Sequence, residues 1–325
     1  MAAPVAAPEG IRRSGTVSRA FSAITANPVA LKELRLRMRG WHSAVLLTGY
    51  LCVVGAVGYL GYAGIAASSS DVVQVGGAGS SLFTGLAAAV MAAVALVVPG
   101  LVAPSVSGER EHGTLELLLA TPVRPRGIVL AKLVAALAMV ALLVLGCAPL
   151  FCIAYMLGGV GVREVLEFAA FLAVGSSCLG TMGMLASVSL RRVAPATVVS
   201  YLAMLVLLAG PFVATFAWQD ASSPESPVVT ATGVQGALEA VSPVMGAQAL
   251  MASNSACGVG GLVTPLVGSL APGTFNTCDG PVQYTTDMGP LGTWQTWEAT
   301  LAFDGVLAIA SLGASLLVFT KRAFP

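Results

Sequence analysis

The sequence has few charged residues and almost none of the groups that soluble enzymes use. Asp, Glu, Lys and Arg make up 10% of the 325 residues, whereas hydrophobic residues make up 56%. A soluble domain carries about 25% charged residues, so this composition excludes an ordinary soluble protein. The net charge of +1 gives no electrostatic reason to expect nucleic acid as a partner.

Catalytic and metal-binding patterns are missing as well. The sequence has two histidines, His42 and His112, and neither forms a plausible triad with a nucleophile. Cys257 and Cys278 have no histidine near them that would complete a zinc site. The phosphate-binding pattern GxxxxGK[ST] does not occur. We therefore expect no cofactor or metal on this chain and no enzymatic activity of its own.

Long apolar segments take the place of these patterns. A helix needs about 20 predominantly apolar residues to cross a bilayer, and six segments meet this condition. We expect an all-α integral membrane protein in which these segments are the membrane spans. Their predicted positions are about 43–66, 82–104, 128–157, 168–190, 196–217 and 298–320.

The basic residues predict which side each connection faces. If both termini lie in the cytoplasm, all but Arg163 of the 16 Lys and Arg residues fall on the cytoplasmic side. Cytoplasmic loops are enriched in Lys and Arg, so this orientation is favoured. No apolar run in the first 40 residues resembles a cleavable signal peptide. We predict a multi-pass protein with cytoplasmic N- and C-termini.

The N-terminal region divides into a tail and an amphipathic helix. Residues 1–26 are rich in Ala, Pro, Ser and Arg and predict a flexible cytoplasmic tail, with a single membrane domain at 27–325. Residues 27–40 predict a helix that lies in the membrane interface. It either transmits force to the first span or simply anchors it. One face of this helix, with a flanking arginine, comprises Leu31, Leu34, Arg35, Met38 and Trp41.

The connection between the second and third spans contains a charge cluster followed by a leucine-rich helix pattern. Glu109, Arg110 and Glu111 form the cluster, and Thr114 can cap the helix that follows Gly113. Leu115, Leu118 and Leu119 share one face of that helix. An exposed leucine face is expected to pack against another surface. That surface belongs to a soluble partner or, alternatively, to the protein's own bundle.

Residues 218–297 predict a long region on the outer side, without Lys or Arg. Its apolar patches at 238–251 and 258–270 are too short to span comfortably, so we expect interfacial or re-entrant helices there. Cys257 and Cys278 are candidates for a disulfide in an oxidising compartment. Asp304, inside the sixth predicted span, is either a functional intramembrane charge or a group that reaches water at the outer interface.

The loop EREHGTLELLLATPVRPRGIVLAKL and the preceding NPVALKELRLRMRG resemble, respectively, the coupling helix and the elbow helix of permease subunits of type-2 ATP-binding-cassette (ABC-2) exporters. Six spans with a long outer region before the last agree with that resemblance.

The resemblance implies a permease subunit that works with a separate cytoplasmic P-loop ATPase, which would hold ATP and Mg²⁺. It also implies a second permease subunit, in a homodimer or a heterodimer, and export of a substrate from the cytoplasm. The ATPase would dock on the loop from Glu109 to Thr121, with the charge cluster as its polar contact and the three leucines as its apolar contact. The expected location is a bacterial plasma membrane, with the bilayer as a further partner.

Three other functions stay open from the sequence. A secondary transporter or channel would typically show internal repeats or several intramembrane charges. A membrane-embedded enzyme would need a nucleophile and a base that converge within the spans. The third is an ABC complex that acts on a membrane sensor or a lipid instead of exporting a solute.

Overall fold

The computed structural model describes residues 40–68, 75–114, 125–158, 160–217, 228–231, 240–254, 283–287 and 293–323. In chain order the helices and strands of these residues are α3 (Trp41–Ser68), α4 (Val75–Val102), α5 (Pro104–Glu111), α7 (Pro125–Gly146), α8 (Ala148–Met156), α9 (Val162–Ser189), α10 (Val193–Ala217), β1 (Val228–Ala231), α12 (Pro243–Asn254), β2 (Gln283–Asp287), β3 (Thr293–Gln295) and α14 (Thr296–Ala323).

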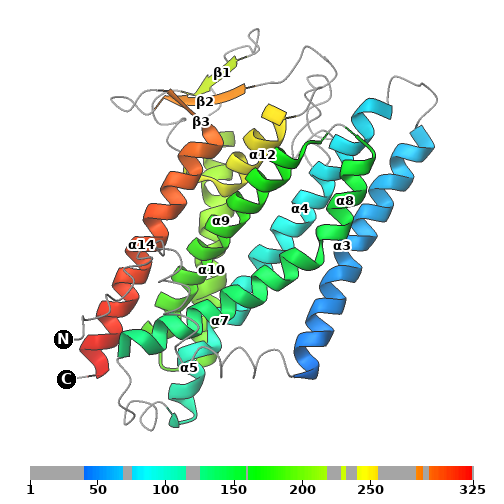
Figure 1. The fold of residues 1–325 in the computed structure, drawn as a ribbon. Coiled ribbons are helices and arrows are strands. Elements are labelled where there is room, and N and C mark those ends of the chain that lie inside the picture. Colours follow the sequence, from blue (N-terminus) through cyan, green and yellow to red (C-terminus); the bar gives the residue numbers. More distant parts are fainter. Residues whose placement is uncertain are drawn as a thin grey trace, which may run out of the picture.

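Six of these segments are long and apolar enough to cross a membrane, which confirms the predicted number of spans. Backbone groups in lipid must be satisfied within the segment, and helices achieve this. In Figure 1, α3 begins and α14 ends at the end of the bundle that carries α5, whereas the strands lie at the opposite end. We call these the α5 end and the sheet end.

Most spans are longer than the sequence predicted. The fourth begins at Val162 instead of 168 because the carboxylate of Glu164 accepts a hydrogen bond from the Gly161 N–H and caps the first turn. Arg163 and Glu167 form an exposed ion pair of 2.7 Å in the same turns. These charged residues therefore belong to the first turns of α9.

The third span is interrupted next to Pro149. Because proline has no N–H and its ring clashes with the preceding turn, α7 ends at Gly146 and α8 starts at Ala148. The change of direction places Phe151 against Phe83 of α4 and Phe168 of α9, with ring centroids 5.5 and 5.9 Å apart. This aromatic cluster holds α8 to the rest of the bundle.

Helix α9 lies at the centre of the bundle, and its small residues permit close packing. In the most apolar 18-residue stretch of α9, 56% of the residues are buried, compared with 11% in α3 and 17% in α10. A Cβ atom added to Gly183 would stand 3.4 Å from Val102 Cβ of α4, and one added to Gly180 would stand 3.3 Å from Leu133 Cδ1 of α7. The small residues therefore serve packing at these positions.

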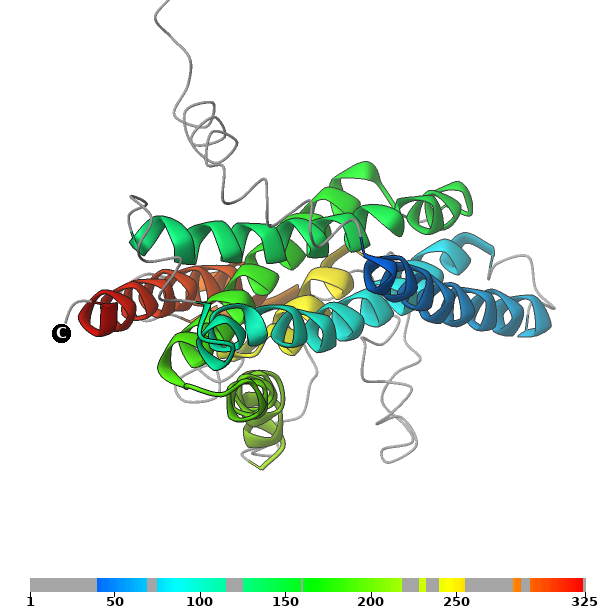
Figure 2. The same cartoon turned by 90° about the horizontal axis from the view of Figure 1, so that it is seen from below.

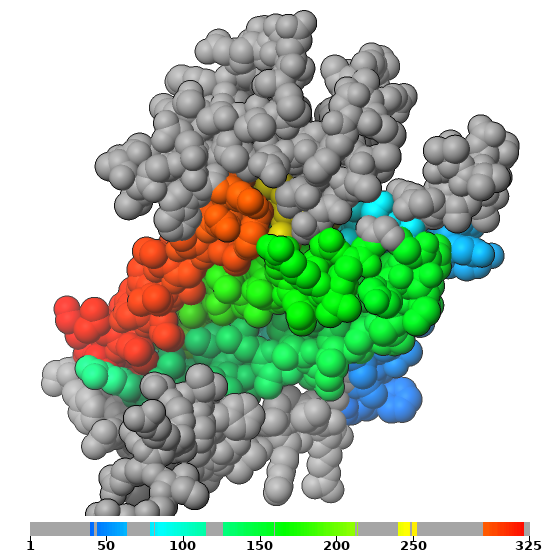
Figure 3. All heavy atoms as spheres, turned by 45° about the horizontal axis from the view of Figure 1, so that its top comes forward, coloured from blue at the N-terminus to red at the C-terminus, as the bar shows by residue number. Residues whose placement is uncertain are grey.

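The peripheral helices can be followed in two views. Seen from the α5 end, α3 and α10 lie at the margins of the bundle (Figure 2). The space-filling view shows side chains of α14, α9, α8 and α7 along one face (Figure 3). Exposed apolar side chains such as Tyr59, Val206 and Ile309 are suited to contact lipid.

Three short strands at the sheet end were not predicted from the sequence. β1 pairs parallel with β2, and β2 pairs antiparallel with β3, in the order β1-β2-β3. The parallel pair requires a crossover connection, and the segment between β1 and β2 contains α12. The membrane bundle itself is helical as expected, and β3 continues directly into α14 at Thr296.

Part of the predicted apolar patch at 238–251 forms α12, which packs against α14, α9 and α10 through the buried Ala247, Leu250 and Met251. A re-entrant course through the membrane stays a prediction. The second patch, 258–270, and the candidate disulfide cysteines Cys257 and Cys278 lie outside the described residues, as do residues 1–39 with the predicted tail.

Gly246 of α12 lies directly against Thr300 of α14. Its replacement by Ala is expected to destabilise the protein by about 1–3 kcal/mol. The added Cβ would lie 2.6 Å from Thr300 Oγ1 and 2.7 Å from Thr300 Cβ, and Thr300 is fully buried. Gly305→Ala on α14 is the matched control because nothing lies within 4 Å of its Cβ position. Thermal unfolding of the purified variants measures both effects, and equal unfolding temperatures would contradict the described helix contact.

Candidate functional site at the end of the second span

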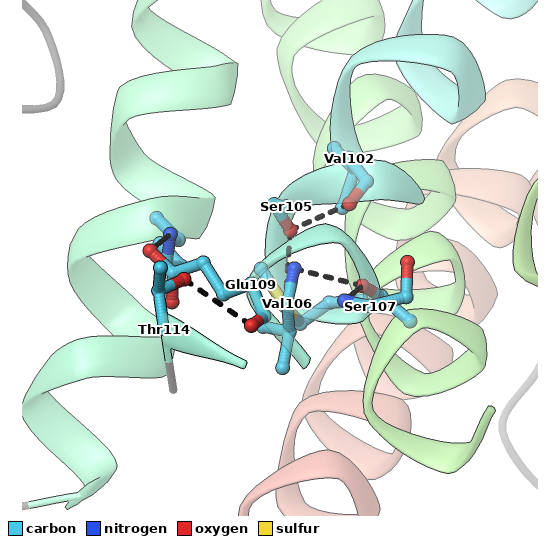
Figure 4. A network of polar contacts seen from close by, with 9 residues as sticks. Val102, Ser105, Val106, Ser107, Glu109 and Thr114 are labelled. Carbon is cyan, nitrogen blue, oxygen red and sulfur yellow. Dashed lines mark hydrogen bonds and ion pairs between the residues drawn. The ribbon is translucent and has the colours of Figure 1, made fainter. Parts of the chain in front are cut away.

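The second span changes direction at Ala103 and continues as α5, which places the predicted charge cluster at the end of a helix. Pro104 occupies the first turn of α5 and has no N–H to continue the hydrogen bonding of α4. The Ser105 hydroxyl donates to Val102 O at 2.6 Å, and the Ser107 hydroxyl donates to Ala103 O at 2.8 Å. Both serines therefore bind carbonyl groups at the bend, and Figure 4 shows the bond from Ser105 to Val102.

A side chain from α9 satisfies the backbone at the start of α5. The first N–H groups of a helix have no partner within it. The hydroxyl oxygen of Ser187 accepts hydrogen bonds from Val106 N at 3.0 Å and Ser107 N at 3.1 Å. Ser187 is fully buried, so water does not replace it. This contact fixes the beginning of α5 to α9.

The three charged residues at the other end of α5 each bind a different helix. Glu109 forms an ion pair of 2.8 Å with Lys132 of α7, whose side chain is only 3% exposed. Arg110 donates to the carbonyl of Val188 in the last turn of α9 at 3.0 Å. The Glu111 carboxylate accepts a hydrogen bond from Val193 N, the first residue of α10, at 2.8 Å.

The signs of these charges suit their partners. The carboxyl end of a helix carries partial negative charge and the amino end partial positive charge. Arg110 therefore lies at the negative carboxyl end of α9, and Glu111 lies at the positive amino end of α10. Each charge is stabilised by the helix end that it contacts. We call Ser187, Lys132 and the cluster Glu109–Glu111 the α5 attachment. It joins α5 to α7, α9 and α10 by polar contacts.

This geometry changes the interpretation of the charge cluster. The sequence analysis assigned Glu109, Arg110 and Glu111 to polar docking of a partner, but each has a partner within the chain. Docking by these residues stays a prediction. Glu111, His112, Gly113 and Thr114 are exposed at this end. Gly113, with φ of 70°, adopts the left-handed conformation that commonly ends a helix.

The structure gives Thr114 a different hydrogen bond from the predicted cap. Its hydroxyl donates to Glu109 O at 3.2 Å, at the carboxyl end of α5 (Figure 4). The predicted leucine-rich helix, with Leu115, Leu118 and Leu119, lies outside the described residues. Of the elbow residues, Leu31, Leu34, Arg35 and Met38 also lie outside them, and Trp41 begins α3 with 80% of its surface exposed.

Two residues of the α5 attachment were missed as site residues from the sequence. Lys132 was counted only toward the orientation, although it lies within the predicted third span and a charge there calls for a partner. Asp304 is thus not the sole ionisable residue within a span. Ser187 carries no signal of its own, because it is one of many small residues in α9 and only the fold brings it to α5.

Asp304 lies apart from this site. It faces the interior of the bundle from α14 and is 1% exposed, so it does not reach water as the alternative interpretation supposed. Within the described residues no three His, Cys, Asp or Glu side chains are grouped to hold a metal ion. The described cysteines, Cys52, Cys147, Cys152 and Cys178, are all free.

Comparison with known proteins gives one result that bears on function. A family model described as "ABC-2 family transporter protein" matches residues 27–323, which is nearly the whole chain. The match begins at the predicted elbow helix and ends with α14. No curated protein matches the chain.

Proposed function

Because the chain belongs to the ABC-2 family of transporter proteins and is thus a membrane transport subunit, we propose that it is the permease of an ATP-driven exporter. ATP and Mg²⁺ would bind a separate cytoplasmic P-loop ATPase, since the sequence lacks the GxxxxGK[ST] pattern. A second permease subunit, either another copy or a relative, would complete the pathway. The complex would lie in a bacterial plasma membrane, with the α5 end and both termini in the cytoplasm.

The α5 attachment is the observation that carries this proposal. A loop that only connected two spans would not need to contact three other spans by polar bonds. Here Glu109, Arg110 and Glu111 bind α7, α9 and α10 over 2.8–3.0 Å. A force applied by the ATPase at the exposed residues after Glu111 would therefore reach four helices of the bundle together.

The proposal predicts that a charge on the leucine face weakens ATPase binding. Leu118→Asp is expected to reduce the co-purifying ATPase at least about tenfold, because a buried unpaired carboxylate at an interface costs more than the 1.4 kcal/mol that this factor requires. The measurement is quantitative mass spectrometry after affinity purification of the tagged chain in mild detergent.

Glu298→Gln is the matched control because it changes one charge at an exposed position near the sheet end. It is expected to leave ATPase recovery unchanged. Equal recovery of the ATPase with Leu118→Asp and with the unaltered chain would exclude docking through this loop. Transport driven by an ion gradient in vesicles that contain the chain alone would instead favour a secondary transporter.

A further inference from the structure

Asp304 is a buried carboxyl group in a membrane span whose oxygens have no hydrogen-bond partner. It lies eight residues after the start of α14, in a 26-residue apolar segment, Thr296–Lys321. Only 1% of its surface is exposed, and neither Oδ1 nor Oδ2 makes a hydrogen bond. A charged carboxylate is very unfavourable in such surroundings unless a partner neutralises it.

The surroundings of Asp304 on α9 are small and uncharged. A Cβ atom added to Gly175 would be in van der Waals contact, 3.9 Å from Oδ2. Cys178 faces the carboxyl group from the next turn and interacts with it electrostatically. Further along the same interface, the Ser311 hydroxyl donates to Thr181 Oγ1 at 2.7 Å. These two hydroxyls are therefore paired, whereas the Asp304 oxygens, among the described residues, are not.

Among the residues that the structure describes, the other elements that pack against α14 bring no cation to Asp304. α12 has no ionisable residue, and neither has β3, whereas β2 ends with the acidic Asp287. On α7 the ionisable residues are Arg126, which is exposed, and Lys132, which is bound to Glu109. On α14 itself, Glu298 and Lys321 are exposed and near its two ends.

The space around Asp304 decides which ligand it can hold. A metal ion would need further ligands, and the described residues offer no group of three. A cavity of about 880 Å³ lies between α7, α8 and α9, and one of about 30 Å³ lies between α4, α9, α10 and α12. Asp304 itself lines neither of them. Gly175 lines the smaller one, which has room for about one water molecule and not for a substrate amine. A proton is the one cation that needs no cavity.

We propose that Asp304 and the face of α9 formed by Gly175 and Cys178 are an intramembrane proton-binding site, with the proton carried on the Asp304 carboxyl group. Release of that proton requires water or a cation at the carboxylate, and the packing of α9 on α14 excludes both. Proton exchange therefore accompanies separation of α9 from α14. This site does not depend on the proposed coupling to an ATPase.

The test uses dicyclohexylcarbodiimide, an apolar reagent that reacts with protonated carboxyl groups. The carboxyl proton moves to a carbodiimide nitrogen while the carboxyl oxygen adds to the central carbon. The adduct then rearranges to a stable N-acylurea with no leaving group. Intact complex in native membranes is expected to acquire one reagent mass on Asp304 near neutral pH, and more slowly as the pH rises. Tandem mass spectrometry locates the label.

Two variants control this experiment. Glu298→Gln removes an exposed carboxylate and is expected to leave the label on Asp304 unchanged. Asp304→Asn is expected to abolish the label and to keep the thermal stability of the protein, because a neutral amide resembles the neutral acid in size and charge. That result separates a proton site from a buried ion pair, in which the Asn variant would leave a cation without its partner.

The proposal is overturned if Asp304 of the intact complex stays unlabelled from about pH 6 to 9, while Asp304 of the chain unfolded in detergent is labelled at acidic pH. It is also overturned if Asp304→Asn strongly lowers the unfolding temperature, since that would reveal a cation bound to an ionised Asp304. Neither result would affect the ATPase co-purification, so failure of this site and failure of the proposed function can be told apart.

Discussion

Replacing Glu109 with Gln is expected to lower the free energy of unfolding by about 3 kcal/mol. The substitution keeps the shape of the side chain but removes the carboxylate that lies 2.8 Å from the Lys132 ammonium. Lys132 is 2% exposed, so water does not replace the lost charge. The unfolding free energy can be measured by titration with a denaturing detergent in mixed micelles.

The chain contains a matched ion pair for comparison. Arg163 and Glu167 lie 2.7 Å apart, nearly the same distance, but the Arg163 side chain is 86% exposed. Glu167→Gln is therefore expected to cost less than about 1 kcal/mol. The double variant Glu109→Gln with Lys132→Met is expected to recover part of the loss, because it removes both charges. Equal effects of Glu109→Gln and Glu167→Gln would contradict the buried ion pair.

Ser187→Ala is expected to destabilise the protein by about 2–4 kcal/mol, because it leaves two buried N–H groups without their acceptor. These are the N–H groups of Val106 and Ser107, at 3.0 and 3.1 Å from Ser187 Oγ. The substitution also detaches the beginning of α5 from α9. We expect weaker protection of the Val106 and Ser107 amides in hydrogen exchange, in addition to the lower unfolding free energy.

Ser177→Ala is the control for this prediction. Ser177 lies on the same helix, but its hydroxyl donates only to Val174 O of its own helix, at 2.7 Å. Its removal leaves no N–H group without an acceptor, so we expect a change within about 0.5 kcal/mol. If Ser187→Ala and Ser177→Ala behaved alike, Ser187 would not be the group that satisfies the start of α5.

The membrane spans could be predicted because their signal is local. A run of about 20 apolar residues has few alternatives to a spanning helix, and the break at Pro149 follows from the missing N–H of proline. The boundaries were less accurate, since capping adds residues that are not apolar, as Glu164 does at the start of α9.

The strands β1 to β3 and the α5 attachment could not be predicted in the same way. Each strand has only three to five residues, too few for an alternating pattern to stand out, although Val, Thr, Tyr and Trp in them favour strands. Ser187 and Val106 are 81 positions apart in the sequence. Their contact depends on how α4 and α9 pack.

The charge cluster has contacts within the chain that the sequence did not reveal. The sequence indicated that Glu109, Arg110 and Glu111 belong to the coupling loop, and it assigned them to a partner on another chain. In the structure they bind α7, α9 and α10. We therefore place the predicted ATPase contact on the exposed residues from Glu111 onward and on the leucine face, with the α5 attachment as the connection to the membrane helices.

The most direct test of the proposed permease function is purification of the tagged, unaltered chain from its native membrane in mild detergent, with identification of every stoichiometric partner by mass spectrometry. The account predicts a soluble subunit with a P-loop and ATPase activity in the purified complex. A chain that purifies alone, or only with membrane proteins, under conditions that preserve a known ABC complex would contradict it.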